Sequence, residues 1–125
     1  TAMSAVEETL ERIKGQPGVE GYVICNQEGT VLRRLPTMSQ SMAEKYASSM
    51  KQLVNKARDV SRDINPREQL RNLRIRTKTR EILVSHDKEF IVILIQQWTP
   101  AAEAENLVMA TMQNTTKVPS KGKGE

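Results

Sequence analysis

The sequence predicts a three-layer α/β fold, and three observations lead to this prediction. Its patterns follow one another as a helix, a hairpin, a long helix and a three-stranded meander. The segment from Phe90 to Ile95 is apolar at every position, which is typical of an interior strand covered on both faces. A chain of 125 residues has room for one such domain and its tails.

The first helix is expected to begin at Ser4. Residues Ser4 to Glu7 have the pattern of a capping box, in which the two side chains bind backbone N–H groups of the first turn. Val6, Leu10 and Ile13 then recur at helical spacing, and a glycine after them favours a stop. Because this apolar stripe is narrow, the helix is expected to lie on another part of the fold.

A β-hairpin is expected after this helix. The apolar run from Tyr22 to Cys25 predicts its first strand, and Thr30 to Leu35 predicts the returning strand. Between them lies a polar turn with Gly29 at the position that tolerates a positive φ.

The long helix is predicted from Ser39 to Ile64, because Asn65 before Pro66 ends it. The sequence leaves two candidates for the N-cap of this helix. Ser41 could start a second capping box, and Ser39 could equally be the cap. The main apolar stripe holds Met42, Tyr46, Met50, Leu53, Ala57, Val60 and Ile64, and Ala43, Ala47 and Val54 widen it. The stripe is broader than contact with one sheet needs.

The meander is predicted to have strands at residues 73–76, 81–84 and 90–95. A tight turn at residues 78 and 79 gives three cross-strand pairs, which are Ile75 with Ile82, Leu73 with Val84, and Arg76 with Glu81. Apolar pairs on one face and an ion pair on the other both support this register. A two-residue turn without glycine is nevertheless unusual.

The domain is expected to span residues 3–97. Residues 98–112 follow as an extension that the pattern predicts to be helical from about residue 100. Its apolar contacts would be Leu107 and Val108. The polar composition of residues 113–125 predicts a disordered tail.

Basic residues are concentrated in the middle of the chain. Residues 51–80 hold ten Lys and Arg against three acidic residues, a local net charge of +7, whereas the whole chain carries +4. An excess of this size indicates either an acidic partner or a solvated basic face, and both interpretations remain open.

The sequence offers no constellation for catalysis or metal binding. The one histidine, His86, lies beside Asp87 in a predicted turn, where a solvated side chain is the simplest interpretation. The one cysteine, Cys25, ends an apolar strand, which favours a buried and unreactive thiol. One Cys and one His cannot make a standard zinc site. We therefore expect no enzymatic activity, no metal and no cofactor.

The sequence also argues against nucleic acids and membranes as partners. None of the four aromatic residues lies on the arginine-bearing strand, where base stacking would need one, so no nucleic acid is expected. No apolar run approaches the ~20 residues that span a bilayer, and no secretory signal is apparent, so no membrane partner is expected. The single cysteine fits a reducing compartment, which favours a cytoplasmic location.

Three stretches of the chain resemble the roadblock family of dynein light chains. They are Val6 to Ile13 in the first helix, Ala57 to Pro66 at the end of the long helix, and Leu73 to Gln96 in the meander. The resemblance covers about residues 5–97 and lies in the order and spacing of the whole pattern. After Gln97 the chain departs from a minimal family member, because a further segment is appended.

The resemblance implies a five-stranded antiparallel sheet with the long helix on one face and the terminal helix or helices on the other. It also implies a non-catalytic homodimer in which the 71–77 edge strands meet and the long helices lie side by side. The implied dimer interface holds Met42, Tyr46, Met50, Leu53, Arg71, Leu73, Arg74, Ile75, Arg76 and Thr77. The broad helical stripe and the open edge strand fit this picture, since two-fold pairing closes an exposed edge.

The partners implied by the resemblance are a dynein intermediate chain and other dynein subunits. The implied location is the cytoplasm and cytoskeleton, with a cilium or flagellar axoneme as the alternative, and the sequence does not separate cytoplasmic from axonemal dynein. Within the same fold, a scaffold that regulates a small GTPase is the alternative function. The absence of P-loop and switch motifs means that such a scaffold would not itself bind nucleotide.

Dimerisation through the edge strand raises an electrostatic problem. It brings Arg74 and Arg76 near their own copies, and like charges across a ladder are destabilising. We hypothesise that Glu81 and an acidic stretch of the partner neutralise this charge, which gives the basic region a binding role. The residues assigned to partner binding are Arg58, Arg62, Arg74 and Arg76.

Overall fold

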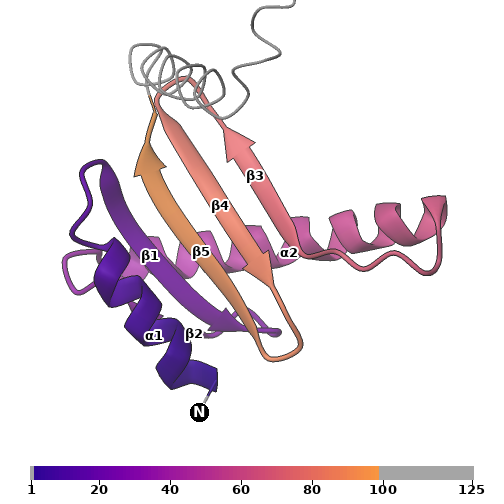
Figure 1. Ribbon diagram of the computed structural model, residues 1–125, viewed down its shortest axis with the longest axis horizontal. Helices are drawn as coiled ribbons and strands as arrows, with labels where there is room; N and C mark the ends of the chain where they lie inside the picture. Colours follow the sequence, from indigo (N-terminus) through magenta and orange to yellow (C-terminus); the bar gives the residue numbers. More distant parts are fainter. Residues whose placement is uncertain (1, 99–125) are drawn as a thin grey trace, which may run out of the picture.

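The computed structural model describes residues 2–98, which form one antiparallel sheet between two helices (Figure 1). The elements are α1 (Ala2–Ile13), β1 (Val19–Asn26), β2 (Val31–Arg34), α2 (Gln40–Ile64), β3 (Asn72–Arg76), β4 (Arg80–His86) and β5 (Phe90–Gln97). The five strands lie in the order β2-β1-β5-β4-β3. The predicted fold class is confirmed, with α2 on one face of the sheet and α1 on the other. The predicted helix at 100–112 and the tail at 113–125 lie outside the described residues.

β5 is the central strand of the sheet, as its uninterrupted apolar sequence predicts. It pairs with β1 on one side and with β4 on the other. Ile91, Ile93 and Ile95 are buried beneath α2, whereas Val92 and Leu94 point to the α1 face and are half-buried. The two faces of one strand therefore contribute to two separate cores.

α1 starts two residues earlier than predicted, at Ala2. Ser4 consequently lies inside the first turn, where its backbone is helical, whereas an N-cap residue needs an extended backbone. The predicted capping box at Ser4 is therefore wrong. Leu10, the middle residue of the predicted apolar stripe, is buried against Tyr22 and Ile24 of the sheet.

α2 starts at Gln40, and of the two open alternatives Ser39 is the cap. The Ser39 backbone is extended, and its hydroxyl accepts a hydrogen bond of 3.1 Å from the backbone N–H of Met42. The helix ends at Ile64, because Asn65 is extended before Pro66 as predicted. The residues that α2 buries against the sheet are Ala43, Ala47, Met50 and Val54.

The predicted register of the meander is confirmed for all three cross-strand pairs. The tight turn forms without glycine because Thr77 supplies part of it. The backbone N–H of Thr77 donates to the carbonyl of Arg80 at 2.8 Å, and the Thr77 hydroxyl accepts from the backbone N–H of Arg80 at 3.1 Å. No residue other than glycine among the described ones has a positive φ, so Lys78 and Thr79 turn the chain without that strain.

The two helices cover the sheet to different extents. The core beneath α2 contains buried residues of α2, β1, β4 and β5. The core beneath α1 has three buried members among the described residues, and they lie on α1 and β1. Figure 1 shows α1 in front of β1, with no described helix in front of β3 and β4. The α1 face of the sheet is thus half covered.

Candidate dimerisation and partner-binding surfaces

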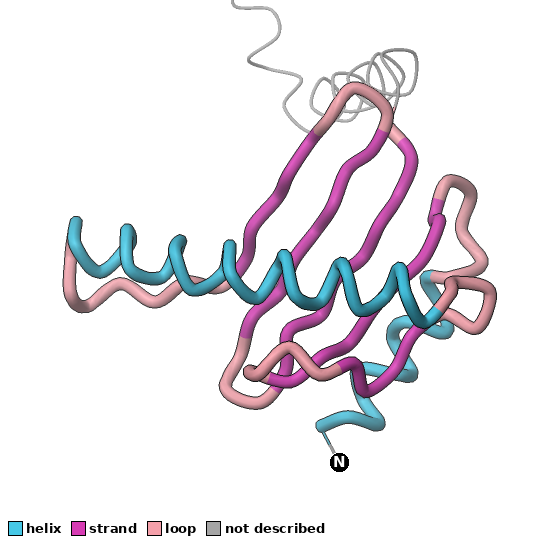
Figure 2. The backbone as a smooth tube through the Cα atoms, turned by 180° about the vertical axis from the view of Figure 1, so that it is seen from behind, coloured by secondary structure: helices cyan, strands magenta, loops and turns pink. Residues whose placement is uncertain are grey.

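The C-terminal half of α2 projects past β3, the edge of the sheet (Figures 1 and 2). Apolar side chains are exposed along the helix, with exposed fractions of 45% for Met42, 38% for Leu53, 47% for Val60 and 81% for Ile64. At 100° per residue these four lie on one face, roughly a quarter of the way round the helix from the buried face. We call these four residues the apolar stripe of α2. It has no covering layer among the described residues.

β3 forms one edge of the sheet, because its only strand partner among the described residues is β4. Leu73 and Ile75 are half-buried on the α2 face and pack against the core there. Arg74 and Arg76 point to the opposite face. The outer edge of β3 contains no proline, so its backbone is able to accept another strand.

On the α1 face, Arg74 and Arg76 share the carboxylate of Glu81. The Arg76 Nη2 to Glu81 Oε2 distance is 2.9 Å, and that from Arg74 Nε to the same oxygen is 3.3 Å. Gln96 Nε2 donates to the other carboxylate oxygen at 2.9 Å. Glu81 is 7% exposed and is the one buried charged residue among those described. The predicted role of Glu81 in neutralising these arginines is therefore consistent with its position.

The surroundings of Glu81 favour its ionised form. Burial acts to raise the pKa of the carboxyl, but hydrogen bonds from Gln96 and Arg76 and the charges of both guanidinium groups outweigh this effect. The pKa of Glu81 is consequently lowered from its ordinary value.

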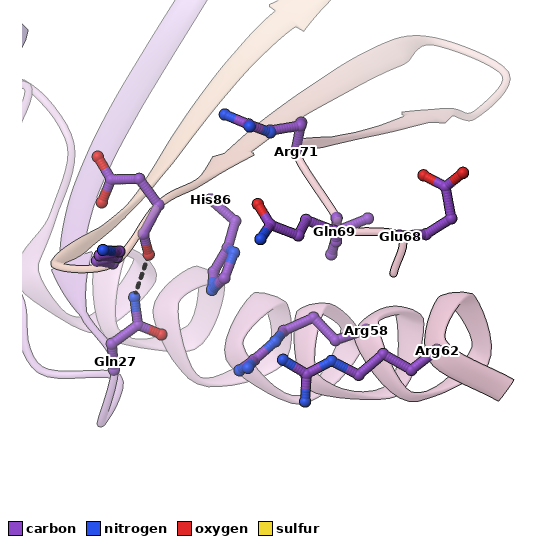
Figure 3. A pocket seen from close by; sticks show the side chains of 10 residues that line it. Gln27, Arg58, Arg62, Glu68, Gln69, Arg71 and His86 are labelled. Carbon is purple, nitrogen blue, oxygen red and sulfur yellow. Dashed lines mark hydrogen bonds between the residues drawn. The ribbon is translucent and has the colours of Figure 1, made fainter. Parts of the chain in front are cut away.

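Arg58 and Arg62 lie on the other side of the sheet from Arg74 and Arg76. They line a hollow of about 620 Å³ between α2, the loop before β3 and the β4–β5 turn. Figure 3 shows both side chains on α2, with Gln69 of that loop opposite them. The other lining residues are Gln27, Glu68, Leu70, Arg71, His86, Asp87 and Lys88. We call this cavity the basic hollow, because four basic residues line it against two acidic ones. The four arginines assigned to partner binding thus form two separate sites.

Two hydrogen bonds fix the walls of the basic hollow. Gln27 Nε2 donates to the carbonyl of Asp87 at 2.7 Å, and the backbone N–H of His86 donates to the carbonyl of Arg71 at 3.0 Å. His86 ends β4 and is half-buried, so its prediction as a solvated turn residue is wrong. Counting by twos from the buried Val84 places His86 on the α2 face, a signal that the sequence already contained.

The predicted interface residues of α2 differ in where they point. Met50 is buried in the core of its own chain, and Tyr46 is half-buried against that core. Met42 and Leu53 belong to the exposed apolar stripe. Residues of β3 and the flanking Arg71 and Thr77 lie along the open edge, in or beside the strand.

Among residues 2–98 no group of three His, Cys, Asp or Glu is placed to hold a metal ion. Cys25 is fully buried, and burial raises the pKa of its thiol to about 11, which disfavours the reactive thiolate. Neither helix of the described chain has the length and apolar character required to cross a bilayer.

The sequence pattern of the roadblock/LC7 domain matches residues 5–97. This chain belongs to the roadblock family. The match ends at the last residue of β5, so it contains every described helix and strand except the first turn of α1. Roadblock domains act in general as non-catalytic adaptors or regulators.

Solved structures of other roadblock proteins share the fold at low identity. The roadblock/LC7 domain from Streptomyces avermitilis is 13% identical with a TM-score of 0.63, covering 68% of this chain and 71% of that one. The gliding protein MglB from Thermus thermophilus is 12% identical with a TM-score of 0.59, covering 73% and 70% respectively. An MglB described in a tetrameric arrangement is 10% identical with a TM-score of 0.63, covering 94% and 90%. At these identities the likeness establishes the roadblock fold alone.

Proposed function

We propose that this roadblock protein is a non-catalytic homodimeric light chain of a dynein motor complex, and that it binds a segment of the dynein intermediate chain. The observation that carries the proposal is the exposed apolar stripe of α2. The C-terminal half of this helix projects past the open edge strand β3 (Figure 2). A stripe of this kind next to an open edge is a surface for a second copy of the same chain.

Two-fold symmetry satisfies both features of this surface at once. If two β3 strands pair about a two-fold axis, the two sheets become continuous and neither edge stays open. The projecting half of each α2 then lies over the sheet of the other subunit. Leu53 and Val60 of one subunit are thereby brought against the α2 helix of the other, which removes apolar surface from water.

The charge of the dimer supports an acidic partner. Each subunit brings Arg74 and Arg76 to the two-fold axis, and Glu81 neutralises one of these two charges. The exposed Arg74 of each subunit and the basic hollow would both attract acidic side chains of an intermediate-chain segment. We place the complex in the cytoplasm and on the cytoskeleton, with a cilium or flagellar axoneme as the alternative.

The roadblock fold also suits a second candidate function, a scaffold that regulates a small GTPase. The solved structures compared above are bacterial roadblock proteins, one of them a gliding protein, so fold similarity gives no preference for dynein. The apolar stripe and the open edge serve a dimeric scaffold as well as a dimeric light chain. The two functions differ in the partner that the dimer recognises.

A co-purification experiment separates the two candidates. The full chain is immobilised and offered an acidic intermediate-chain segment in one assay and a small GTPase, loaded with GDP or GTP, in the other. The dynein role predicts capture of the segment and no capture of either GTPase form. Capture of the GTPase alone, from purified components, would replace the proposed function with the second candidate.

A further inference from the structure

Two arginines of the basic hollow have no acidic partner among the described residues. Arg58 and Arg62 lie four residues apart on α2, so their like charges share one face of the helix and destabilise each other. Both line the hollow, and Arg58 is half-buried there. Neither forms an ion pair within residues 2–98. An anion bound between the two guanidinium groups would turn this repulsion into attraction.

The two acidic residues that line the hollow do not neutralise these arginines. One oxygen of the Asp87 carboxylate accepts from the backbone N–H groups two and three residues later, at 2.9 and 2.8 Å, and so stabilises its own turn. Figure 3 shows the carboxylate of Glu68 directed away from Arg58 and Arg62. The hollow therefore presents its positive charge to whatever enters it.

Three further hydrogen-bond donors line the same hollow. They are His86 at the end of β4, Arg71 before β3 and Lys88 in the β4–β5 turn. In Figure 3 the ring of His86 points toward α2, on the side where the ends of Arg58 and Arg62 lie. The two hydrogen bonds in the walls hold these elements in place, so the site is formed before a ligand arrives.

We propose that the basic hollow binds a phosphorylated side chain, a phosphoserine or phosphothreonine, of a partner protein. A phosphate monoester carries about 1.5 to 2 negative charges at pH 7 and three strong acceptor oxygens. This matches two arginines and a third donor, whereas a carboxylate offers one charge and two oxygens. The planar fork of a guanidinium group fits the geometry of phosphate oxygens. Because the proposal concerns the chemistry of the site, it holds whichever partner carries the phosphate.

The remainder of the hollow suits a peptide. Its volume of about 620 Å³ is much larger than a phosphate group, so the residues that flank the phosphate enter with it. Gln27 and Gln69 bring side-chain amides, which can hydrogen-bond a peptide backbone, and the half-buried Leu70 offers an apolar contact. No Phe, Tyr or Trp lines the hollow, so the base of a nucleotide would lack the ring on which bases stack. A phosphopeptide therefore fits better than a nucleotide.

Titration of the full chain with short peptides, followed by NMR, tests this site. The probe is a phosphoserine flanked by two glycines on each side, and matched peptides carry aspartate or unmodified serine in its place. The phosphopeptide should bind roughly tenfold more tightly than the aspartate peptide. It should shift the side-chain Nε–H signals of Arg58 and Arg62, and the serine peptide should not. Equal affinity for the phosphoserine and aspartate peptides, or shifts confined to Arg74 and Arg80, would overturn the proposal.

Two small anions test whether a peptide is the ligand. Inorganic phosphate and adenosine monophosphate carry the same kind of group without a peptide backbone, so each should bind more weakly than the phosphopeptide. Equal or tighter binding of either one would overturn the assignment to a peptide. None of these probes contains a dynein sequence, so their outcome is separate from that of the co-purification experiment.

Variants separate a built site from general attraction by charge. Arg58→Gln should weaken binding of the phosphopeptide roughly tenfold. Arg67→Gln removes the same charge from an exposed residue that does not line the hollow, and it should leave the affinity unchanged. Arg58→Lys/Arg62→Lys keeps both charges but removes the guanidinium forks, so most of the preference for phosphoserine over aspartate should be lost. Equal weakening by the two glutamine variants, or full preference in the lysine variant, would contradict recognition by these arginines.

Discussion

Glu81 is the one charged side chain that is buried among the described residues. One of its oxygens accepts from Gln96 and the other faces both Arg76 and Arg74, so three side chains stabilise its ionised form. The sequence predicted its pairing with Arg76 from the register alone. The hypothesis that Glu81 also neutralises Arg74 is consistent with the diagonal contact between them. The contribution of Gln96 was not predicted, because it depends on which residue of β5 lies opposite Glu81.

Replacing Glu81 should lower stability in a pH-dependent way. Because the folded-state pKa is lowered, the ionised carboxylate stabilises the fold above its unfolded pKa of about 4.5, and this contribution is lost as the pH falls below that value. Glu81→Gln should therefore cost about 2 kcal/mol in free energy of unfolding at pH 7 and progressively less below pH ~4.5. Urea denaturation of both proteins at several pH values measures this. A difference that stayed constant down to pH ~3 would contradict the assigned role.

The helices and strands were predictable where local pattern decides them. The register of β3 and β4 followed from Ile75 and Arg76, since each face had its own matching partners. The start of α1 was not predictable from Ser4, because a good capping sequence does not prevent the preceding residues from being helical. The sequence pattern did not decide whether Ser39 or Ser41 caps α2. The extended backbone of Ser39 shows that Ser39 is the cap.

The turn between β3 and β4 depends on a hydroxyl group. Thr77→Val removes the acceptor for the backbone N–H of Arg80 and should lower the free energy of unfolding by about 1 kcal/mol. Thr79→Val, two residues away, removes a hydroxyl of the same kind and serves as the control. Thermal denaturation of the two variants compares them directly. Equal melting temperatures would mean that the Thr77 side chain does not hold the turn.

The apolar stripe of α2 should stabilise the dimer and contribute little to the stability of a single subunit. Leu53 is 38% exposed, so Leu53→Asp should leave the subunit folded but convert a dimer to monomers. Gln52→Asp adds the same charge at the adjacent exposed position and should leave the dimer intact. Sedimentation at micromolar concentration, with circular dichroism as the check of folding, measures both. A folded Leu53→Asp dimer would place the interface elsewhere.

In the whole molecule, the basic residues that form one continuous stretch of the sequence lie on two separate surfaces. Arg58 and Arg62 line the basic hollow on the α2 side, while Arg74 and Arg76 lie on the α1 face. A run of charge in the sequence gives no indication of this division, because it depends on the path of the chain between α2 and β3. The half-covered α1 face was likewise not predictable from the narrow stripe of α1.

The division allows the two surfaces to be tested separately. Arg58→Ala/Arg62→Ala and Arg74→Ala/Arg76→Ala each remove two charges, so each should weaken binding of an acidic intermediate-chain segment and reduce its dependence on salt. Titrations at several salt concentrations measure the affinity and its slope for both variants. If one pair left both quantities unchanged, that face would have no part in binding this partner.

The strand order has a consequence for biosynthesis. β5 is the last described strand to be made, yet it occupies the middle of the sheet and joins the β1–β2 hairpin to the β3–β4 hairpin. Until it emerges from the ribosome, the two hairpins have no shared partner, and apolar surfaces meant for β5 stay in water. The nascent chain thus remains unfinished through most of translation. A product truncated before Phe90 would leave two further strand edges open, on β1 and β4, and open edges are prone to aggregation.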